Sequence, residues 1–158
     1  MENNEGKIEN QPLIKLVRAG TEDVDAYIEL EKSIGETRTY SAMTDPEEAR
    51  ELLSKDTVYF IKEGDEVVGN VSYQMKSSDH AYIDGLLVRP PYQGRGLGRA
   101  AMVKVLEELK DVKLIDLVTH PDNERAIKLY ESLGFTRGVR IENYFGDGEP
   151  RIVMTLNH

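Results

Sequence analysis

The segment from Arg89 to Met102, RPPYQGRGLGRAAM, combines residue types that bind anions and stands just before an apolar stretch with helical spacing. Glycines allow a tight turn whose backbone N–H groups point inward, and the N-terminus of the following helix adds a partial positive charge. Arginine side chains add charge-assisted hydrogen bonds to phosphate. The residues concerned are Gly94, Gly96 and Gly98 together with Arg89, Arg95 and Arg99. Their spacing predicts a phosphate-binding loop, with a plain strand-to-helix turn as the alternative.

Two common nucleotide-binding patterns do not fit this loop. A P-loop requires a lysine followed by serine or threonine after its second glycine, and QGRGLGRA contains neither. A dinucleotide fingerprint requires G-x-G-x-x-G with an acidic residue farther along the chain, whereas the spacing here is G-x-G-x-G. The residues alone therefore indicate a phosphate group without naming the molecule that carries it.

Two motifs give the chain a resemblance to a known family. The pattern Val88-x-x-x-x-Gln93-x-x-Gly96-x-Gly98 resembles the pyrophosphate loop of the GNAT acetyltransferase superfamily. The block HPDNERAIKLYESLGF (His120–Phe135) resembles the second segment with which that family binds coenzyme A, where an asparagine opens a helix that ends Leu-Tyr-x-x-x-Gly-Phe. The resemblance covers residues 57–156 well and the first 56 residues by element order. It implies an acetyl-CoA-dependent N-acetyltransferase.

The resemblance also implies where acetyl-CoA binds. In the family, two parallel strands separate at their C-terminal ends, and the pantetheine arm lies in the gap along exposed backbone. Unpaired backbone groups need such partners, and a peptide-like arm supplies them. On this chain the implied contacts are the strand end Leu86, Leu87 and Val88, the loop Gln93, Gly94, Arg95, Gly96, Leu97, Gly98 and Arg99, and the helix cap Asn123.

Asp84 is the candidate general base. An amine of pKa about 10.4 is protonated at neutral pH, so a base must accept its proton. Asp84 is an isolated acid in the apolar segment AYIDGLLV, and Gly85 beside it permits a β-bulge. An acidic residue matches this position in polyamine acetyltransferases of the superfamily. An ordinary aspartate is a weak base, so a raised pKa or a water relay is required; His120 is a second candidate, and a solvent-facing carboxylate is the alternative.

The bases of other branches of the superfamily are missing. Ribosomal-protein N-terminal acetyltransferases carry a catalytic glutamate where this chain has Val118, and histone-type enzymes carry theirs where it has Tyr82. Tyr130 matches the family tyrosine that protonates the leaving thiolate, although its place on the apolar face of a helix also suits packing. The backbone N–H of Leu87 or Val88 is the expected oxyanion donor.

The acceptor amine is open. Polyamine, lysine side chain, protein N-terminus, amino sugar and antibiotic amines all fit the chemistry, and the net charge of −9 favours a cation, unless it serves only solubility. We expect the loop Ser33–Asp45 to close over the acceptor. Tyr144 and Phe145 either cover it or are ordinary hairpin aromatics. Because the chain has no cysteine to carry an acyl group, direct transfer in a ternary complex is expected. A non-catalytic acyl-CoA-binding sensor is the alternative function.

The composition limits the other classes of function. The acidic balance disfavours nucleic acid as a partner. The three histidines are scattered without the spacing of metal ligands. No apolar run approaches the ~18 residues that span a membrane, so we expect a cytoplasmic protein with no membrane partner. A homodimer is left open. We expect residues 1–12 to be a disordered lead-in and residues 13–158 to form one domain.

The elements that position these residues follow from hydrophobic periodicity and turn signals. The expected order is βααβββαβαββ, with antiparallel hairpins before a parallel strand–helix–strand unit. This is an α/β mixed sheet, mostly antiparallel, with a parallel, splayed central pair flanked by helices. The expected strands are Leu13–Arg18, Thr57–Lys62, Glu66–Met75, His80–Val88, Lys113–Thr119, Phe135–Asn143 and Arg151–Leu156. The expected helices are Thr21–Ser33 with Thr21 as its cap, Pro46–Leu53, residues 96–110 and Asn123–Leu133.

Overall fold

A computed structural model describes residues 12–158 and confirms the expected α/β architecture. The expected lead-in, apart from Pro12, lies outside the described residues. The strands are β1 (Lys15–Arg18), β2 (Thr57–Glu63), β3 (Glu66–Ser77), β4 (His80–Val88), β5 (Leu114–Thr119), β6 (Thr136–Ile141) and β7 (Arg151–Asn157). The helices are α2 (Val24–Lys32), α3 (Pro46–Lys55), α4 (Leu97–Glu108) and α5 (Glu124–Ser132), with 3₁₀ turns η1 (Thr21–Asp23) and η2 (Pro90–Tyr92).

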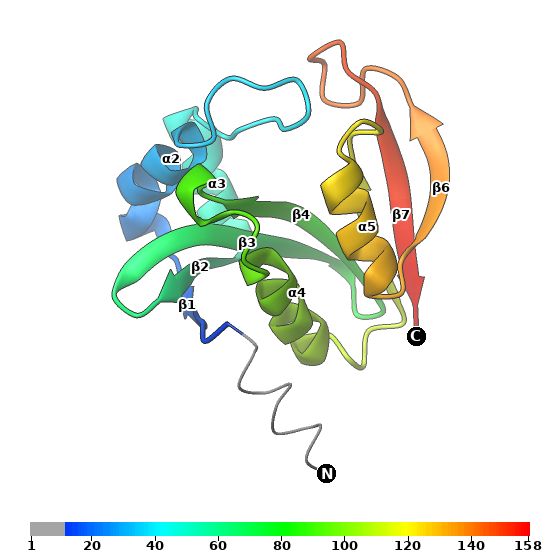
Figure 1. Ribbon diagram of the computed structural model, residues 1–158, viewed down its shortest axis with the longest axis horizontal. Helices are drawn as coiled ribbons and strands as arrows, with labels where there is room; N and C mark the ends of the chain where they lie inside the picture. Colours follow the sequence, from blue (N-terminus) through cyan, green and yellow to red (C-terminus); the bar gives the residue numbers. More distant parts are fainter. Residues whose placement is uncertain (1–11) are drawn as a thin grey trace.

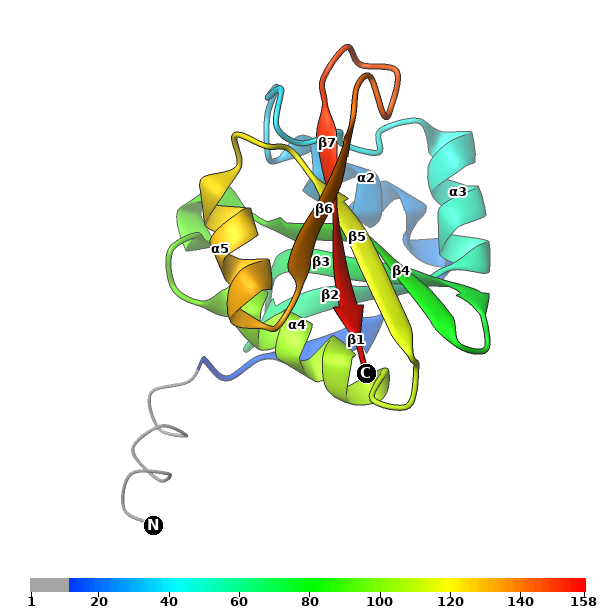
Figure 2. The ribbon, with the colours of Figure 1, turned by 90° about the vertical axis from the view of Figure 1, so that its right-hand side faces the viewer.

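The strands form one seven-stranded sheet in the order β1-β2-β3-β4-β5-β7-β6, and β4 and β5 are its parallel pair. Helices α2 and α3 lie on one face of the sheet and α4 and α5 on the other, as the two views show (Figures 1 and 2). Each face has its own apolar core: Met102, Val105 and Ile115 belong to the cluster under α4 and α5, whereas Tyr27, Leu53 and Val58 belong to the cluster under α2 and α3. The sheet is therefore the middle layer of three.

The parallel pair opens at one end. β4 and β5 are paired from His80 and Leu114 to Ile83 and Leu117, and their pairing stops there. Beyond this point β4 continues beside β3 as far as Val88 opposite Gly69, while β5 continues beside β7. The result is a fork in the middle of the sheet, in which Asp84–Val88 have no strand partner on the β5 side. The expected splayed pair is confirmed.

A β-bulge marks the base of the fork. Ser72 of β3 is opposite Gly85, but the next residue, Tyr73, is opposite Ile83, so Asp84 is the extra residue of β4. A bulge bends its strand and increases its twist, which turns the rest of β4 away from β5. It also shifts the alternation of side chains: Leu86 packs with the α4 and α5 cluster and Leu87 with the α2 and α3 cluster.

Two local expectations need correction. Thr21 is not the cap of the first helix: Gly20 precedes the opening 3₁₀ turn, and its backbone N–H donates to the Asp23 carboxylate over 2.9 Å. The Asp23 carboxylate, three residues after Gly20, thus accepts a hydrogen bond from the backbone at the start of the turn. Residue 135 and residues 142–143 lie outside β6, which begins at Thr136 and ends at Ile141.

Between Pro12 and His158, none of the helices has the length and apolar character needed to cross a membrane.

Gly69 is predicted to be required for the close approach of β3 and β4 at the end of the fork. A Cβ at this position would lie 2.0 Å from the backbone oxygen of Leu87, and backbone cannot rotate aside. We expect Gly69→Ala to lower the free energy of unfolding by about 2–4 kcal/mol, measured by urea denaturation. Gly20→Ala is the control, because its Cβ would meet only the flexible carboxylate of Glu22. Equal stability of the two variants would contradict the argument.

Candidate active site

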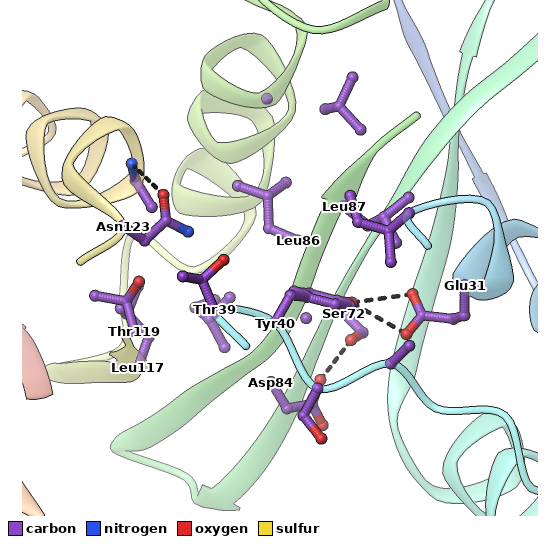
Figure 3. A pocket seen from close by; sticks show the side chains of 18 of the residues that line it. Glu31, Thr39, Tyr40, Ser72, Asp84, Leu86, Leu87, Leu117, Thr119 and Asn123 are labelled. Atoms are coloured by element: carbon purple, nitrogen blue, oxygen red, sulfur yellow. Dashed lines mark hydrogen bonds between the residues drawn. The ribbon is translucent and has the colours of Figure 1, made fainter. Parts of the chain in front are cut away.

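A cavity of about 1010 Å³ occupies the fork and reaches both faces of the sheet. One end is lined by the loop before α4 and by α5; the other is lined by α2 and the loop between α2 and α3. The strand end Leu86–Val88 and the bulged Asp84 lie between the two ends. Figure 3 shows Leu86 on the side of the helices α4 and α5, with Asp84, Ser72, Tyr40 and Glu31 toward the other end. One passage therefore connects two chemically different halves.

The first half contains a row of free backbone donors. Gly94 and Gly96 adopt the left-handed conformation, with φ of 81° and 78°, which other residues rarely adopt. Gly96 is the N-cap of α4, and the first helical hydrogen bond runs from the Ala100 N–H to the Gly96 carbonyl over 3.0 Å. The N–H groups of Leu97, Gly98 and Arg99 therefore have no partner within the helix. Such an arrangement binds anions.

The side chains of this loop differ in their use. Gln93 donates its amide to the Val88 carbonyl over 2.9 Å, which ties the loop to the end of β4. Arg99 lines the cavity. Arg95 does not: its guanidinium pairs with Glu63 of β2 over 2.7 Å. Of the expected loop contacts, Arg95 is thus the one whose side chain the structure directs elsewhere.

Helix α5 brings Asn123 and Tyr130 to the same half of the cavity. Asn123 is the N-cap, and its Oδ1 accepts from the Ala126 N–H over 3.2 Å, which leaves its NH₂ group as a donor. Tyr130 is buried, and its ring packs edge-on against Phe135 with 5.9 Å between centroids. Burial raises the pKa of Tyr130 to about 12. Its hydroxyl makes no hydrogen bond within residues 12–158, so it remains a neutral donor that faces the cavity.

Asp84 is a partly buried acid with an unusual environment. The Ser72 hydroxyl donates to its Oδ1 over 2.5 Å (Figure 3). Burial, followed by a hydrogen bond with the Asp56 carboxyl, raises the pKa of Asp84 to about 8, and the bond from Ser72 opposes this change. The raised pKa that the sequence required of a base is therefore present, and the bulge provides the position.

Glu31 was missed by the sequence reasoning. Only 1% exposed, it accepts hydrogen bonds from the Tyr40 hydroxyl (3.0 Å), the Met43 N–H (3.0 Å) and the Asn70 amide (2.8 Å). Burial raises its pKa although these bonds oppose the change. The sequence held a signal, because Glu31 falls on the apolar stripe of α2 at helical spacing from Val24, Tyr27 and Ile28. Its carboxylate fixes the Ser33–Asp45 loop as a wall of the second half.

A second group of polar contacts holds the far end of that loop. Arg38 pairs with Asp122 over 2.7 Å and approaches Glu149 to 3.7 Å, so that three loops meet above the cavity. His120 belongs to this group: its Nδ1 accepts from the Asp122 N–H and its Nε2 contacts Glu149 over 2.7 Å. With both nitrogens engaged and no place in the cavity wall, His120 is positioned to hold loops together.

The loop between β6 and β7 closes the remaining side. Phe145 lines the cavity. The guanidinium of the buried Arg151 lies over its ring, with 5.1 Å between the Arg151 Cζ and the ring centroid. Tyr144 packs against Phe145 and approaches the Tyr82 hydroxyl to 3.4 Å. Of the two aromatics, Phe145 thus reaches the cavity and Tyr144 supports it. Within residues 12–158, no group of three or more histidine or acidic side chains is placed to hold a metal ion.

Comparison with known proteins links this geometry to a family. Residues 24–135 match the acetyltransferase (GNAT) family. A ribosomal protein bS18-alanine N-acetyltransferase from Escherichia coli is 40% identical over 83 residues, which are 49% of this chain and 56% of that protein. A mycothiol acetyltransferase from Nocardiopsis dassonvillei is 50% identical over 50 residues, which are 30% of this chain and 15% of that protein. The aligned segment thus spans little more than half the length of the first relative.

Solved structures share the fold. The crystal structure of a ribosomal-protein alanine N-acetyltransferase from Escherichia coli has a TM-score of 0.77 at 24% identity, over 92% of this chain and 94% of that one. A GNAT acetyltransferase from Elizabethkingia anophelis, determined with acetyl-CoA bound, has a TM-score of 0.65 at 19% identity, over 72% and 84%. With most of its length matched by the family and both family motifs at the fork, the chain belongs to the GNAT acetyltransferase family.

Proposed function

We propose that residues 13–158 form one catalytic domain that moves an acetyl group from acetyl-CoA to a primary amine by direct transfer in a ternary complex. The observation that carries the proposal is the passage through the fork. It joins a half lined with free backbone donors to a half that contains an acid of raised pKa. The thioester and the amine can thus approach from opposite faces of the sheet and meet beside Leu86–Val88.

The residues of the first half fit acetyl-CoA. The unpaired edge of β4 offers backbone groups to a pantetheine arm, and the Asn123 amide offers a further donor. The N–H groups at the start of α4, with Arg99, suit a pyrophosphate. Gly96 leaves open space there, because the nearest atom to a Cβ would be the Pro12 Cγ at 3.7 Å. When bound, acetyl-CoA supplies an acyl thioester, which an amine attacks with loss of a thiolate.

Asp84 is proposed to accept the proton of the amine. Removing a proton from an ammonium of pKa about 10.4 at pH 7 costs about 4.6 kcal/mol. If Asp84 has a pKa of about 8, the pKa of the ammonium exceeds that of the base by roughly 2.4 units. Transfer of the proton from the ammonium to ionised Asp84 then costs about 3.3 kcal/mol, taking 1.36 kcal/mol per unit. A water molecule between the two groups would relay the same proton. Above pH 8 the ionised Asp84 is the larger fraction.

Tyr130 is proposed to donate a proton to the thiolate. Its hydroxyl stays neutral at physiological pH because burial raises its pKa to about 12. The backbone N–H of Leu87 or Val88 is proposed to bind the oxygen on which negative charge develops, as preorganised donors do in acyl transfer. All three roles belong to groups that already meet at the fork.

The acceptor is proposed to be a cationic amine: a protein N-terminus, a lysine side chain or a polyamine. Support comes from the second half of the cavity, whose lining includes two acidic residues, Glu31 and Asp84, together with Tyr27. One relative is named as an enzyme that acetylates an alanine of ribosomal protein bS18. The structural neighbours include a spermidine/spermine N-acetyltransferase from Vibrio cholerae. Those activities are stated for those proteins.

The proposed function is tested with a panel of amines and release of free coenzyme A thiol. We expect turnover with at least one cationic amine, and Asp84→Asn should lose most of it while acetyl-CoA binding, measured by calorimetry, is retained. Acetyl-CoA binding without turnover on any amine would support an acyl-CoA sensor instead. A best substrate without positive charge would contradict the proposed acceptor class.

The glycine loop is tested by Gly96→Val. A branched side chain at a positive φ displaces the loop and blocks backbone approach to phosphate, so the Kd for acetyl-CoA should rise at least tenfold, equivalent to about 1.4 kcal/mol. Gly148→Val is the matched control, because Gly148 has a φ of 82° and open surroundings in the β6–β7 loop. An unchanged Kd in a folded Gly96 variant would refute the assignment of the loop.

The proton donor is tested by Tyr130→Phe. Because the hydroxyl has no hydrogen bond to lose within the described chain, the free energy of unfolding should change by less than about 1 kcal/mol. We expect kcat to fall about 10²–10⁴-fold, the range for general acid catalysis. Tyr73→Phe is the control, since the Tyr73 hydroxyl bonds Glu108 outside the cavity. A kcat within a factor of two of the parent would leave Tyr130 a packing role only.

A further inference from the structure

Gly85 follows Asp84 in the bulge of β4, and its backbone conformation does not explain why it is a glycine. Its φ lies outside the positive range that other residues rarely adopt. The space beside it is the more informative feature. A Cβ on Gly85 would lie 2.8 Å from the Ser72 Oγ and 3.9 Å from the Asn70 Oδ1. Apart from its chain neighbours, no other atom of residues 12–158 would come within 4 Å.

Ser72 of β3 uses this space to reach Asp84. Its hydroxyl donates to the Asp84 Oδ1 over 2.5 Å (Figure 3). Ser72 is buried and is opposite Gly85, while the next residue of β3 is opposite Ile83. Asp84 and Gly85 are thus the two residues that the bulge sets against one residue of the partner strand. A side chain on Gly85 would compete with Asp84 for the place beside the Ser72 hydroxyl.

The bond between Ser72 and Asp84 is made at the wall of the cavity, which both residues line. An aspartate carboxyl group can turn about two side-chain bonds, and a hydrogen bond from a buried strand restricts both rotations. A general base must lie within about 2.6–3.2 Å of the group whose proton it accepts. A carboxyl group that is held in one orientation therefore meets this requirement more often than one that turns freely.

The charged groups around Asp84 provide no substitute for this bond. Among residues 12–158, no lysine, arginine or histidine forms an ion pair with Asp84. Lys76 of β3 lies over the Tyr82 ring, and His80 of β4 pairs with Asp116 of β5. Asp56, before β2, raises the pKa of Asp84, whereas the bond from Ser72 lowers it. The titratable groups that line the cavity with Asp84 add no positive charge on this side: Tyr27 and Glu31 of α2, Tyr40, and Tyr82 of β4.

We propose that Ser72 is a positioning residue whose hydroxyl holds Asp84 in place as the base, and that Gly85 keeps free the space which this hydroxyl needs. The inference rests on the proposed function for its catalytic meaning, whereas the bond and the requirement at Gly85 do not. It adds two residues on facing strands that act on the amine through Asp84.

The proton balance leaves Ser72 unchanged. The ionised Asp84 takes a proton from the bound ammonium: an N–H bond breaks, an O–H bond forms, and the electron pair stays on nitrogen for attack on the acyl carbon. The Ser72 hydroxyl keeps its own proton throughout.

The first experiment measures the titration of Asp84 in the ligand-free protein, by carbon-13 NMR of labelled aspartate carboxyls. Loss of the signal in Asp84→Asn assigns it. We expect a midpoint near pH 8 in the parent. Ser72→Ala should raise the midpoint by about 1 pH unit, because the ionised form loses a hydrogen-bond donor. Gly85→Ala should raise it similarly, because the new Cβ turns the Ser72 hydroxyl away from Asp84.

The double variant Ser72→Ala/Gly85→Ala gives the sharper test. Without the hydroxyl, a Cβ on Gly85 has no atom of residue 72 within 4 Å. The second substitution should therefore move the midpoint no farther than Ser72→Ala alone, which is the non-additivity expected of two residues that act through one contact. Additive shifts overturn the role of Gly85, and an unmoved midpoint in Ser72→Ala overturns the proposal.

Asn70→Ala is the matched control. Asn70 is the buried polar residue two positions before Ser72 on the same face of β3, but its amide donates to Glu31 over 2.8 Å. An Asp84 midpoint that moves as far in this variant as in Ser72→Ala contradicts a specific role of the hydroxyl. Thermal unfolding of each variant confirms that a folded protein is titrated. This readout is independent of acetyl transfer, so it separates failure of the inference from failure of the proposed function.

The second experiment follows kcat/KM against pH with the best amine. In Ser72→Ala we expect the acidic limb of the profile to move to higher pH by the shift that NMR reports, so that kcat/KM at pH 7 falls about tenfold. A merely structural role of Ser72 would lower the plateau without moving the limb. A moved NMR midpoint with an unmoved limb contradicts Asp84 as the base, and with it the catalytic role of Ser72.

Discussion

The end of the ladder between β4 and β5 is the constraint from which the rest of the site follows. Two strands that separate inside a sheet leave backbone donors and acceptors unpaired, and such groups require partners. The separation begins directly after Ile83 and Leu117, at the bulged Asp84. One inserted residue thus bends β4, opens the passage and sets the candidate base at its edge. The opening of the passage and the position of the candidate base therefore depend on the same residue.

The second constraint is the negative charge beneath α2. Glu31 and Asp84 are at least partly buried and both line the cavity, and burial of carboxylates is costly unless they are hydrogen-bonded or protonated. The protein uses both solutions. Glu31 receives three kinds of hydrogen-bond donor and holds the neighbouring loop, whereas Asp84 keeps a proton up to a pH of about 8. Similar acids therefore serve different purposes because their partners differ.

Local patterns were enough to predict the elements, the parallel pair and the glycine loop. Turn residues, hydrophobic periodicity and the spacing around Gly96 and Asn123 are patterns within short segments of the chain. They can therefore be recognised in a single sequence. The contact between the Ser72 hydroxyl and Asp84 could not be found in this way, because it depends on the register of β3 against β4. His120 was placed near the chemistry by sequence proximity, yet its contacts with Asp122 and Glu149 bind it into the loops instead. The guanidinium of Arg95, which was expected to contact phosphate, pairs with Glu63, a contact between distant segments that local patterns do not show.

The two apolar clusters have a consequence for how this protein can diversify. The residues that hold the glycine loop and α5 belong to the cluster on one face, and those that hold α2 and its loop belong to the cluster on the other. Mutations in separate clusters have nearly additive effects on stability. Substitutions beside Tyr40 and substitutions behind the glycine loop are therefore expected to change the free energy of unfolding independently of each other. Natural variation or directed mutagenesis on the α2 side of the cavity can therefore change the acceptor while the binding of acetyl-CoA on the α4 and α5 side is kept.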